Sequence, residues 1–163
     1  MSDIVVRKPV PEEASRIADL HQITWEETYH DKLPPSAWGP AAHKRRTQMW
    51  EQITQDSDPS KHFAVVELDG KLVGFAGAGP SRSEDAPRDF ELWFIYLLES
   101  AQGTGAGQAL FDEVVGDRPC YLWVIDDNPR AEAFYKRNGF ALDGARQPVG
   151  IEDSKAEEVR MVR

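Results

Sequence analysis

The stretch 90–111 constrains the fold of this chain more than any other. Residues 90–98 are almost wholly apolar, with Glu91 as the exception, and they are rich in aromatic and branched side chains. A short apolar run that ends at a polar break is typical of a strand buried on both faces. Three glycines follow, and apolar residues then recur at helical spacing from Ala109 onward. The stretch therefore predicts a strand, a glycine-rich turn and a helix.

This unit favours an anion site. Glycine lets backbone N–H groups approach a ligand closely, and the start of a helix carries a partial positive charge. A phosphate is the most natural ligand, although the pattern also fits a tight connection that binds nothing. The turn is not a P-loop, because Gln108 and Ala109 stand where that motif requires Lys and then Ser or Thr. Its G-x-G-x-G spacing also departs from the dinucleotide-binding fingerprint.

The net charge limits the classes of partner. The formal charge is −9, from 19 basic and 28 acidic residues. Nucleic acids and anionic membranes are bound through a basic surface, so neither is expected as a partner. The acidic excess fits two interpretations. It either serves solubility alone, or it forms an acidic cleft that gathers a cationic substrate.

Length and composition predict one domain spanning residues 1–163. An apolar content of 40% and a charged content of 29% are ordinary for a globular protein. No apolar run has the length of a signal segment or a membrane span. The single cysteine, Cys120, forms no internal disulfide, and the four histidines lack metal-type spacing. We therefore expect a cytoplasmic protein that binds no metal.

The rest of the chain predicts a mixed sheet with helices on its faces. Pro11 begins a helix in which His21, Trp25 and Tyr29 share one face. Pro129 begins another, which ends in a left-handed cap at Asn138–Gly139. The predicted order is β, α, α, β, β, β, α, β, α, β, β. The remaining expected elements are strands at 4–7, 63–68, 72–77, 120–125, 140–145 and 159–162, and a helix from about Ser36 to Gln55.

Two segments of the chain resemble motifs of the GNAT acetyltransferases. Gln102–Gly107 (QGTGAG) is similar to their Q/R-x-x-G-x-G/A loop, and Asn128–Phe140 (NPRAEAFYKRNGF) is similar to their N-x-x-A-x-x-F-Y-x-x-x-G-F segment. The segments also stand in the order and at the separation usual in the family. The resemblance covers residues 62–163 well and the N-terminal helices more loosely.

The resemblance implies a fold and a co-substrate. The GNAT fold is a mixed, mostly antiparallel, twisted sheet of about six to seven strands with helices on both faces. It would divide this chain into acceptor-side helices, at about 11–56, and an acetyl-CoA-binding core, at about 62–145. The co-substrate would be acetyl-CoA, and no metal is implied.

The resemblance also assigns residues to the site. The pyrophosphate would bind the loop, whose helix start suits anions. The end of the preceding strand would bind the pantetheine arm, with an N–H near Leu97 polarising the thioester carbonyl. Asn128 would help to hold the arm, and Tyr135 would bind there and protonate the departing CoA thiolate. The cofactor-binding residues predicted in this way are Tyr96, Leu97, Leu98, Gln102, Gly103, Thr104, Gly105, Ala106, Gly107, Asn128 and Tyr135.

Several of these assignments have structural alternatives. Asn128 is also a favoured helix N-cap, and Tyr135 also suits a hydrophobic core. Thr104 stands where the family is often basic, which leaves open the partner of the 3′-phosphate. The candidates for that role are Arg130, Lys136 and Arg137.

Glu91 is the first candidate for the catalytic base. Its position before the loop resembles that of a base glutamate in some family members, and burial would raise its pKa toward a useful value. Strand alternation would place its side chain on the face of Trp93, Ile95 and Leu97. A strand-end glutamate that faces water is the equal alternative. Asp126 and Tyr29 are lesser candidates.

The function implied is an acetyl-CoA-dependent N-acetyltransferase that acts by direct transfer in a ternary complex. The acceptor would be a small, cationic primary amine, and the partner therefore a small molecule. Trp25, Tyr29 and the loop 79–88 would line the acceptor pocket. The alternatives are acetylation of a protein or peptide amine and a CoA-binding sensor without catalysis. The chain could be a monomer or a homodimer.

Overall fold

The computed structural model of the chain describes residues 2–163. The strands of its sheet are β1 (Ile4–Arg7), β2 (His62–Leu68), β3 (Lys71–Pro80), β4 (Phe90–Leu97), β5 (Tyr121–Ile125), β6 (Ala141–Pro148) and β7 (Glu157–Val162). The helices are α1 (Ala14–Tyr29), α2 (Pro40–Gln55), α3 (Ala106–Val114) and α4 (Pro129–Arg137). Short 3₁₀ segments lie at Pro11–Glu13, Pro35–Trp38 and Glu99–Ala101. The predicted order of strands and helices is confirmed.

The strands form one sheet in the order β1-β2-β3-β4-β5-β7-β6. Neighbouring strands are antiparallel with one exception, the parallel pair β4 and β5. The predicted mixed, mostly antiparallel sheet of six to seven strands is therefore confirmed. The β2–β3 connection is a two-residue turn at Asp69–Gly70, and both residues have positive φ.

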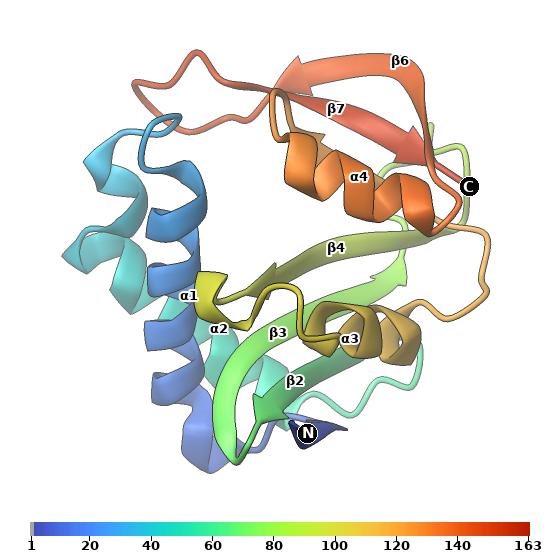
Figure 1. The fold of residues 1–163 in the computed structure, drawn as a ribbon. Helices are drawn as coiled ribbons and strands as arrows, with labels where there is room; N and C mark the ends of the chain where they lie inside the picture. Colours follow the sequence, from blue (N-terminus) through green and yellow to red (C-terminus); the bar gives the residue numbers. More distant parts are fainter. Residues whose placement is uncertain (1) are drawn as a thin grey trace.

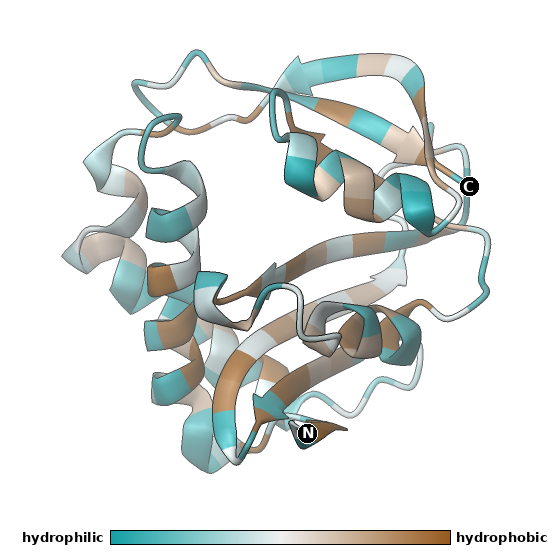
Figure 2. Cartoon of the chain, in the orientation of Figure 1, coloured by the Kyte–Doolittle hydropathy of each residue, from teal (hydrophilic) through white to brown (hydrophobic). Residues whose placement is uncertain are grey.

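The helices cover both faces of the sheet (Figure 1). On one face α1 and α2 pack Ile17 and Trp50 against Phe75 of β3. On the other face α3 and α4 pack against the strands through Phe111 and Tyr135. Figure 2 shows hydrophobic residues concentrated along the central strands, while the outward sides of the helices are hydrophilic. Each helix thus buries one apolar stripe against the sheet.

Helix α2 begins later than predicted. Residue 36 lies in a 3₁₀ segment, and Gly39 is extended because the residue before a proline is disfavoured in a helix. Pro40 then occupies the first turn of α2. The most buried side chain of the helix is Trp50, whose indole N–H donates to Nδ1 of His21 on α1 at 3.1 Å.

A β-bulge breaks the predicted alternation along β4. Trp93 has no partner in the register with β3, so β4 contains one extra residue at this point. An extra residue exchanges the faces of the strand beyond it. Ile95 and Leu97 therefore pack on the α3 side, while Tyr96 packs on the α1 side. The prediction that Glu91 shares a face with Ile95 and Leu97 was wrong.

None of the helices in residues 2–163 combines the length and the apolar content needed to cross a membrane. Over the same residues, His, Cys, Asp and Glu side chains form no group of three that could hold a metal ion. Cys120 is buried and carries a free thiol.

Candidate active site

Two cavities meet where β4 and β5 separate. The parallel register places Glu91 opposite Tyr121 and Leu92 opposite Leu122, and it ends there. The α3-side cavity has a volume of about 630 Å³ and is bounded by β4, α3 and α4. The α1-side cavity has a volume of about 650 Å³ and is bounded by α1, β4, β5 and β7. Residues that line both are Tyr29, Trp93, Phe94, Tyr96 and Trp123.

The glycine-rich loop forms one wall of the α3-side cavity. Gly103 and Gly105 have φ values of +79° and +94°, which side chains rarely tolerate. The first N–H of α3 that donates to the backbone is that of Ala109, 3.0 Å from the oxygen of Gly105. Within residues 2–163, the N–H groups of Gly107 and Gln108 find no protein acceptor. Free N–H groups at the start of a helix are suited to an anion.

Not every predicted loop residue reaches the cavity. Gln102 and the three glycines line it, whereas Thr104 and Ala106 do not. The Thr104 hydroxyl donates to the oxygen of Ala101 at 2.5 Å and accepts the N–H of Ala106 at 3.3 Å. These two residues therefore shape the loop from within.

The free edge of β4 lies along the same cavity. Leu98 donates its N–H to Val73 of β3 at 2.8 Å. Because N–H groups alternate along a strand, those of Ile95 and Leu97 point away from β3, toward the gap beside β5. Tyr96 and Leu97 line the cavity, but Leu98 does not. A free edge of this kind can pair with an extended ligand.

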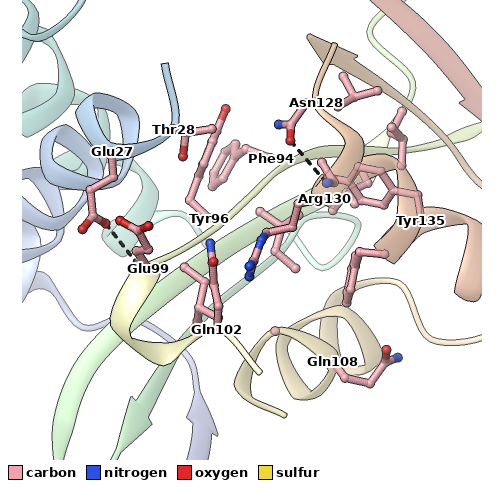
Figure 3. A pocket seen from close by; sticks show the side chains of 18 of the residues that line it. Glu27, Thr28, Phe94, Tyr96, Glu99, Gln102, Gln108, Asn128, Arg130 and Tyr135 are labelled. Carbon is pink, nitrogen blue, oxygen red and sulfur yellow. Dashed lines mark hydrogen bonds between the residues drawn. The ribbon is translucent and has the colours of Figure 1, made fainter. Parts of the chain in front are cut away.

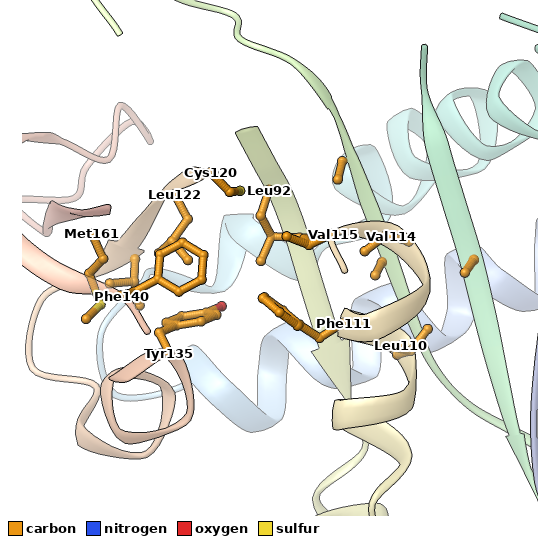
Figure 4. Close-up of a cluster of buried hydrophobic side chains, with 14 of the residues drawn as sticks. Leu92, Leu110, Phe111, Val114, Val115, Cys120, Leu122, Tyr135, Phe140 and Met161 are labelled. Atoms are coloured by element: carbon orange, nitrogen blue, oxygen red, sulfur yellow. The ribbon is translucent and has the colours of Figure 1, made fainter. Parts of the chain in front are cut away.

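Asn128 and Tyr135 lie on the α4 side of this cavity (Figure 3). The Oδ1 atom of Asn128 accepts the N–H of Ala131 at 3.3 Å, so the expected N-cap is present, and the side-chain N–H₂ group is not used by it. The Tyr135 ring packs among Phe111, Phe140 and neighbouring core residues (Figure 4). Burial raises the pKa of Tyr135, and its hydroxyl makes no hydrogen bond to residues 2–163.

Two arginines and two glutamates, Glu27 and Glu99, line the α3-side cavity. Arg130 and Arg137 line it, and neither forms an ion pair with a residue in 2–163. Lys136, the third candidate for the 3′-phosphate, does not line the cavity and lies 3.8 Å from Glu132.

Aromatic rings dominate the α1-side cavity. The predicted stripe is present, with ring centroids 5.9 Å apart for His21 and Trp25 and 5.1 Å apart for Trp25 and Tyr29. The hydroxyls of Tyr29 and Tyr96 lie 2.9 Å apart, at the boundary between the two cavities. Burial raises the pKa of Tyr29, and it raises the pKa of Tyr96 to about 12. Both phenols are therefore neutral at physiological pH.

Glu91 is buried in the wall of the α1-side cavity and is fully engaged. Its carboxylate accepts the backbone N–H of Arg82 at 3.1 Å and two guanidinium N–H groups of that residue, at 3.2 and 2.7 Å. The Tyr121 hydroxyl donates to it at 3.0 Å. The carboxylate thus connects the loop after β3 with the side chain of Tyr121 on β5. The water-facing alternative does not describe Glu91, since its side chain is only 2% exposed.

The lesser base candidates lie differently. Asp126 lines neither cavity and pairs with Arg146 at 2.5 Å, and this hydrogen bond lowers its pKa. Tyr29 lies in both cavities, but as a neutral phenol it is a weak base.

The charges in the α1-side cavity are balanced. Arg82 and Arg160 line it together with Glu91 and Glu158. The acidic excess of the chain is therefore not concentrated in this wall. Arg82 and Ser83 in this wall come from the loop after β3, within the stretch 79–88 that was expected to line an acceptor pocket.

Sequence reasoning missed Glu158 and Arg160. On β7 these residues alternate with the buried Val159 and Met161, a pattern that ordinarily indicates one core face and one solvent face. The sheet order places β7 beside β5, and this topology turns the polar face toward the cavity. Nothing local in the sequence distinguishes such a wall from a solvent surface.

Residues 17–140 match the sequence model of the acetyltransferase (GNAT) family. An uncharacterized N-acetyltransferase of Bacillus subtilis, YuaI, is 33% identical over 132 residues, which cover 77% of this chain and 74% of the relative. An uncharacterized N-acetyltransferase of Mycobacterium tuberculosis, Rv2669, is 36% identical over 96 residues, which cover 55% of this chain and 59% of the relative.

Solved structures share the fold. PaiA N-acetyltransferase from Thermoplasma acidophilum, in complex with coenzyme A, superposes with a TM-score of 0.75 at 19% identity, covering 99% of this chain and 98% of that one. A ribosomal-protein-alanine N-acetyltransferase from Brucella melitensis gives a TM-score of 0.73 at 20% identity, with 98% of each chain covered. At these identities the likeness concerns the fold.

Proposed function

The chain belongs to the GNAT family of acetyltransferases, an acyltransferase family that uses acetyl-CoA, and from that premise we propose that it acetylates a small, cationic primary amine by direct transfer in a ternary complex. The observation that carries the proposal is the pair of cavities with a shared wall at Tyr29 and Tyr96. Direct transfer requires two ligands to be bound side by side with their reacting atoms in contact.

The α3-side cavity fits acetyl-CoA, which supplies an acetyl thioester when bound. Free N–H groups at Gly107 and Gln108 suit the pyrophosphate. Arg130 and Arg137 have no ion-pair partner within residues 2–163 and can bind the 3′-phosphate. Thr104 and Ala106 support this loop rather than touch the ligand, and Leu98 supports the strand.

The edge of β4 aligns the acyl end of the ligand. The N–H groups of Ile95 and Leu97 are directed into the gap beside β5, where they can donate to an amide or to the thioester carbonyl. A donor fixed in place stabilises the negative charge that develops on that oxygen during attack. The side-chain N–H₂ of Asn128 is a further donor on the opposite wall.

Tyr135 is suited to protonate the sulfur. The acceptor ammonium loses one proton before it attacks and a second after the C–N bond forms, while the C–S bond breaks and the thiolate gains a proton. Because burial raises its pKa, the Tyr135 hydroxyl is protonated throughout the physiological range and can donate.

The α1-side cavity takes the acceptor. Trp25 and Tyr29 form its aromatic wall, and the Glu91–Arg82 pair closes one end. We assign Glu91 to holding Arg82 and Tyr121 in position, since its carboxylate accepts hydrogen bonds from both side chains. On this assignment α1 and α2 supply the acceptor side and the rest of the chain the acetyl-CoA side of a single domain.

An acceptor screen with initial-velocity kinetics tests the proposal. The purified chain is supplied with acetyl-CoA and a panel of small amines, lysine-containing peptides and peptide α-amines, and CoA thiol release is measured. We expect turnover on small cationic amines, intersecting velocity patterns, and no burst of CoA without acceptor. Preference for peptides would favour the protein-acetylating alternative. Acetyl-CoA binding without any turnover would favour the sensor, and a parallel pattern would exclude the ternary mechanism.

A further inference from the structure

Glu158 is the one wall charge of the α1-side cavity that has no ion-pair partner within residues 2–163. Arg82 lies 2.7 Å from Glu91, and Arg160 lies 2.7 Å from Asp143. The Glu158 carboxylate is half-buried and accepts one amide N–H, from Gln147 at 2.6 Å. Burial raises its pKa. The charge of Arg82 partly offsets this effect, but Arg82 is itself paired with Glu91, so a cationic ligand is a suitable complement for the half-buried carboxylate.

Glu158 also lies at the end of β5 that borders the α1-side cavity. On β7 it stands opposite Ile125, the last residue of β5, where the gap between β4 and β5 is open. Burial is the largest cause of the raised pKa of Tyr29, and the interaction with Tyr96 comes next. The charge of Glu158 adds to this increase, and it also raises the pKa of Tyr96. Those two phenols mark the boundary between the cavities.

The other lining residues of this cavity indicate what kind of ligand body it fits. Trp25, Trp93, Phe94 and Trp123 present rings, and Met49, Ile125 and Val149 add aliphatic surface. A second positive charge on the ligand would lie in a wall that already contains Arg82 and Arg160. A wall with one carboxylate outside any ion pair and several aromatic rings matches a single ammonium on an apolar body.

We propose that Glu158 binds the ammonium group of the acceptor, and that the acceptor is a monocationic primary amine with an apolar body of aromatic size, in place of a polyamine. This inference rests on the proposed function, because it assigns the α1-side cavity to the acceptor. It makes Glu158 a specificity-determining residue that no motif of the sequence indicates. Cation–π contact with the surrounding rings adds to the same preference.

Two acceptors of equal length separate the charge from the shape. 2-Phenylethylamine is a cation at pH 7, whereas O-benzylhydroxylamine has the same chain length and is neutral. Glu158→Gln retains an oxygen for Gln147 and removes the charge. We expect KM for 2-phenylethylamine to rise about 10- to 100-fold, as for a lost hydrogen-bonded charge, and KM for O-benzylhydroxylamine to change less than about threefold. In the parent, kcat/KM for 2-phenylethylamine should exceed that for spermidine.

Glu157→Gln is the matched control. Glu157 precedes Glu158 on the same strand, lines neither cavity and is exposed at the surface. This variant should behave as the parent on both acceptors. A melting temperature for Glu158→Gln at or above that of the parent would show that its defect is not unfolding, because the substitution removes a half-buried charge.

The outcomes distinguish this inference from the proposed function. Equal losses on the charged and neutral acceptors, or a preference for spermidine, would overturn the role of Glu158 or the acceptor class. If no amine is turned over, calorimetric binding of 2-phenylethylamine in the presence of CoA still decides the question. Binding that is lost in Glu158→Gln supports the inference while the proposed function fails, and binding that is unchanged overturns the inference.

Discussion

The two cavities are built from different parts of the chain and by different groups. The α3-side cavity combines side chains such as Arg130 and Tyr135 with backbone groups of the loop at Gly103–Gly107, the free edge of β4 and the start of α3. The α1-side cavity is formed by side chains, and its charges come from β4, β7 and the loop after β3. Backbone donors need a particular local conformation, which a short motif can encode. A wall of side chains needs only that suitable residues lie side by side, and the strand order of the sheet brings them together.

This difference explains which ligand a sequence can reveal. A backbone site tolerates few substitutions, because a Cβ at a left-handed position such as Gly105 is strained whatever the space around it. A side-chain wall can change one residue at a time without affecting the fold. The proposed acetyl-CoA site is therefore recognisable from a motif, while the proposed acceptor site must be found from the assembled structure.

Of the predicted changes, Gly105→Asp should have the largest effect, a loss of CoA affinity. This effect should be confined to the α3-side cavity. The substitution adds a negative charge at the start of α3, where the free N–H groups lie. Like charges placed together cost several kcal/mol, so Kd for CoA should rise on the order of 10²-fold or more. Calorimetry with CoA measures the change directly. Binding of 2-phenylethylamine to the α1-side cavity should be little affected.

Gly144→Asp controls for backbone strain in that experiment. Gly144 has a φ of +91°, close to that of Gly105, and no atom lies near its missing Cβ. It lies on β6 and lines neither cavity. The control should lose a similar amount of stability and keep the affinity for CoA. If both variants lose affinity equally, the loop does not bind the phosphates.

The sequence allowed the order of elements to be predicted because each element has local signals. Pro129 begins α4, Gly139 ends it with a φ of +91°, and Asp69–Gly70 makes the hairpin turn. The bulge at Trp93 has no such signal, because it depends on how β3 and β4 pair. Since that one residue exchanges the faces of β4, the predicted surroundings of Glu91 were wrong although the strand itself was right.

Tyr135→Phe tests the role of a side chain, rather than the backbone, in the α3-side cavity. The ring packs among Phe111 and Phe140, and the hydroxyl makes no hydrogen bond within residues 2–163, so folding and CoA affinity should be nearly unchanged. Loss of the proton donor should lower kcat by about 10²-fold, at the lower end of general-acid effects. The lower end is expected because burial raises the pKa of the phenol and weakens it as an acid.

Rapid-quench measurement of acetyl transfer in a single turnover checks this effect where the chemical step limits the rate. The melting temperature and Kd for CoA serve as controls in the same variant. A single-turnover rate equal to that of the parent would make Tyr135 a packing residue, and the protonation of sulfur would then fall to water.

The α1-side cavity, in contrast, carries groups that oppose folding at low pH. Burial, and after it the charge of the Arg46 guanidinium, together lower the pKa of His21 to about 3. The imidazole is neutral, and its Nδ1 accepts the indole N–H of Trp50 at 3.1 Å. An unfolded chain would protonate the same histidine near pH 6.5. Stability is therefore complete above pH 6.5 and falls as the pH drops toward 3.

The smallest predicted effect follows from this linkage between protonation and folding. It tests whether the loss of stability at low pH arises from His21 in the α1-side cavity. At pH 5 the unfolded chain gains about 2 kcal/mol from protonating His21, since each pH unit below its unfolded pKa is worth about 1.4 kcal/mol. His21→Asn keeps an acceptor for Trp50 and cannot titrate, so its unfolding free energy should fall by about 2 kcal/mol less than that of the parent between pH 7 and pH 5. Urea unfolding at both pH values measures the difference. His30→Asn, at an exposed position, is the control, and its unfolding free energy should change with pH as that of the parent does. If the unfolding free energy fell equally in the parent and in His21→Asn, the acid sensitivity would arise from groups other than His21. The α1-side cavity would then contribute no more to it than the α3-side cavity.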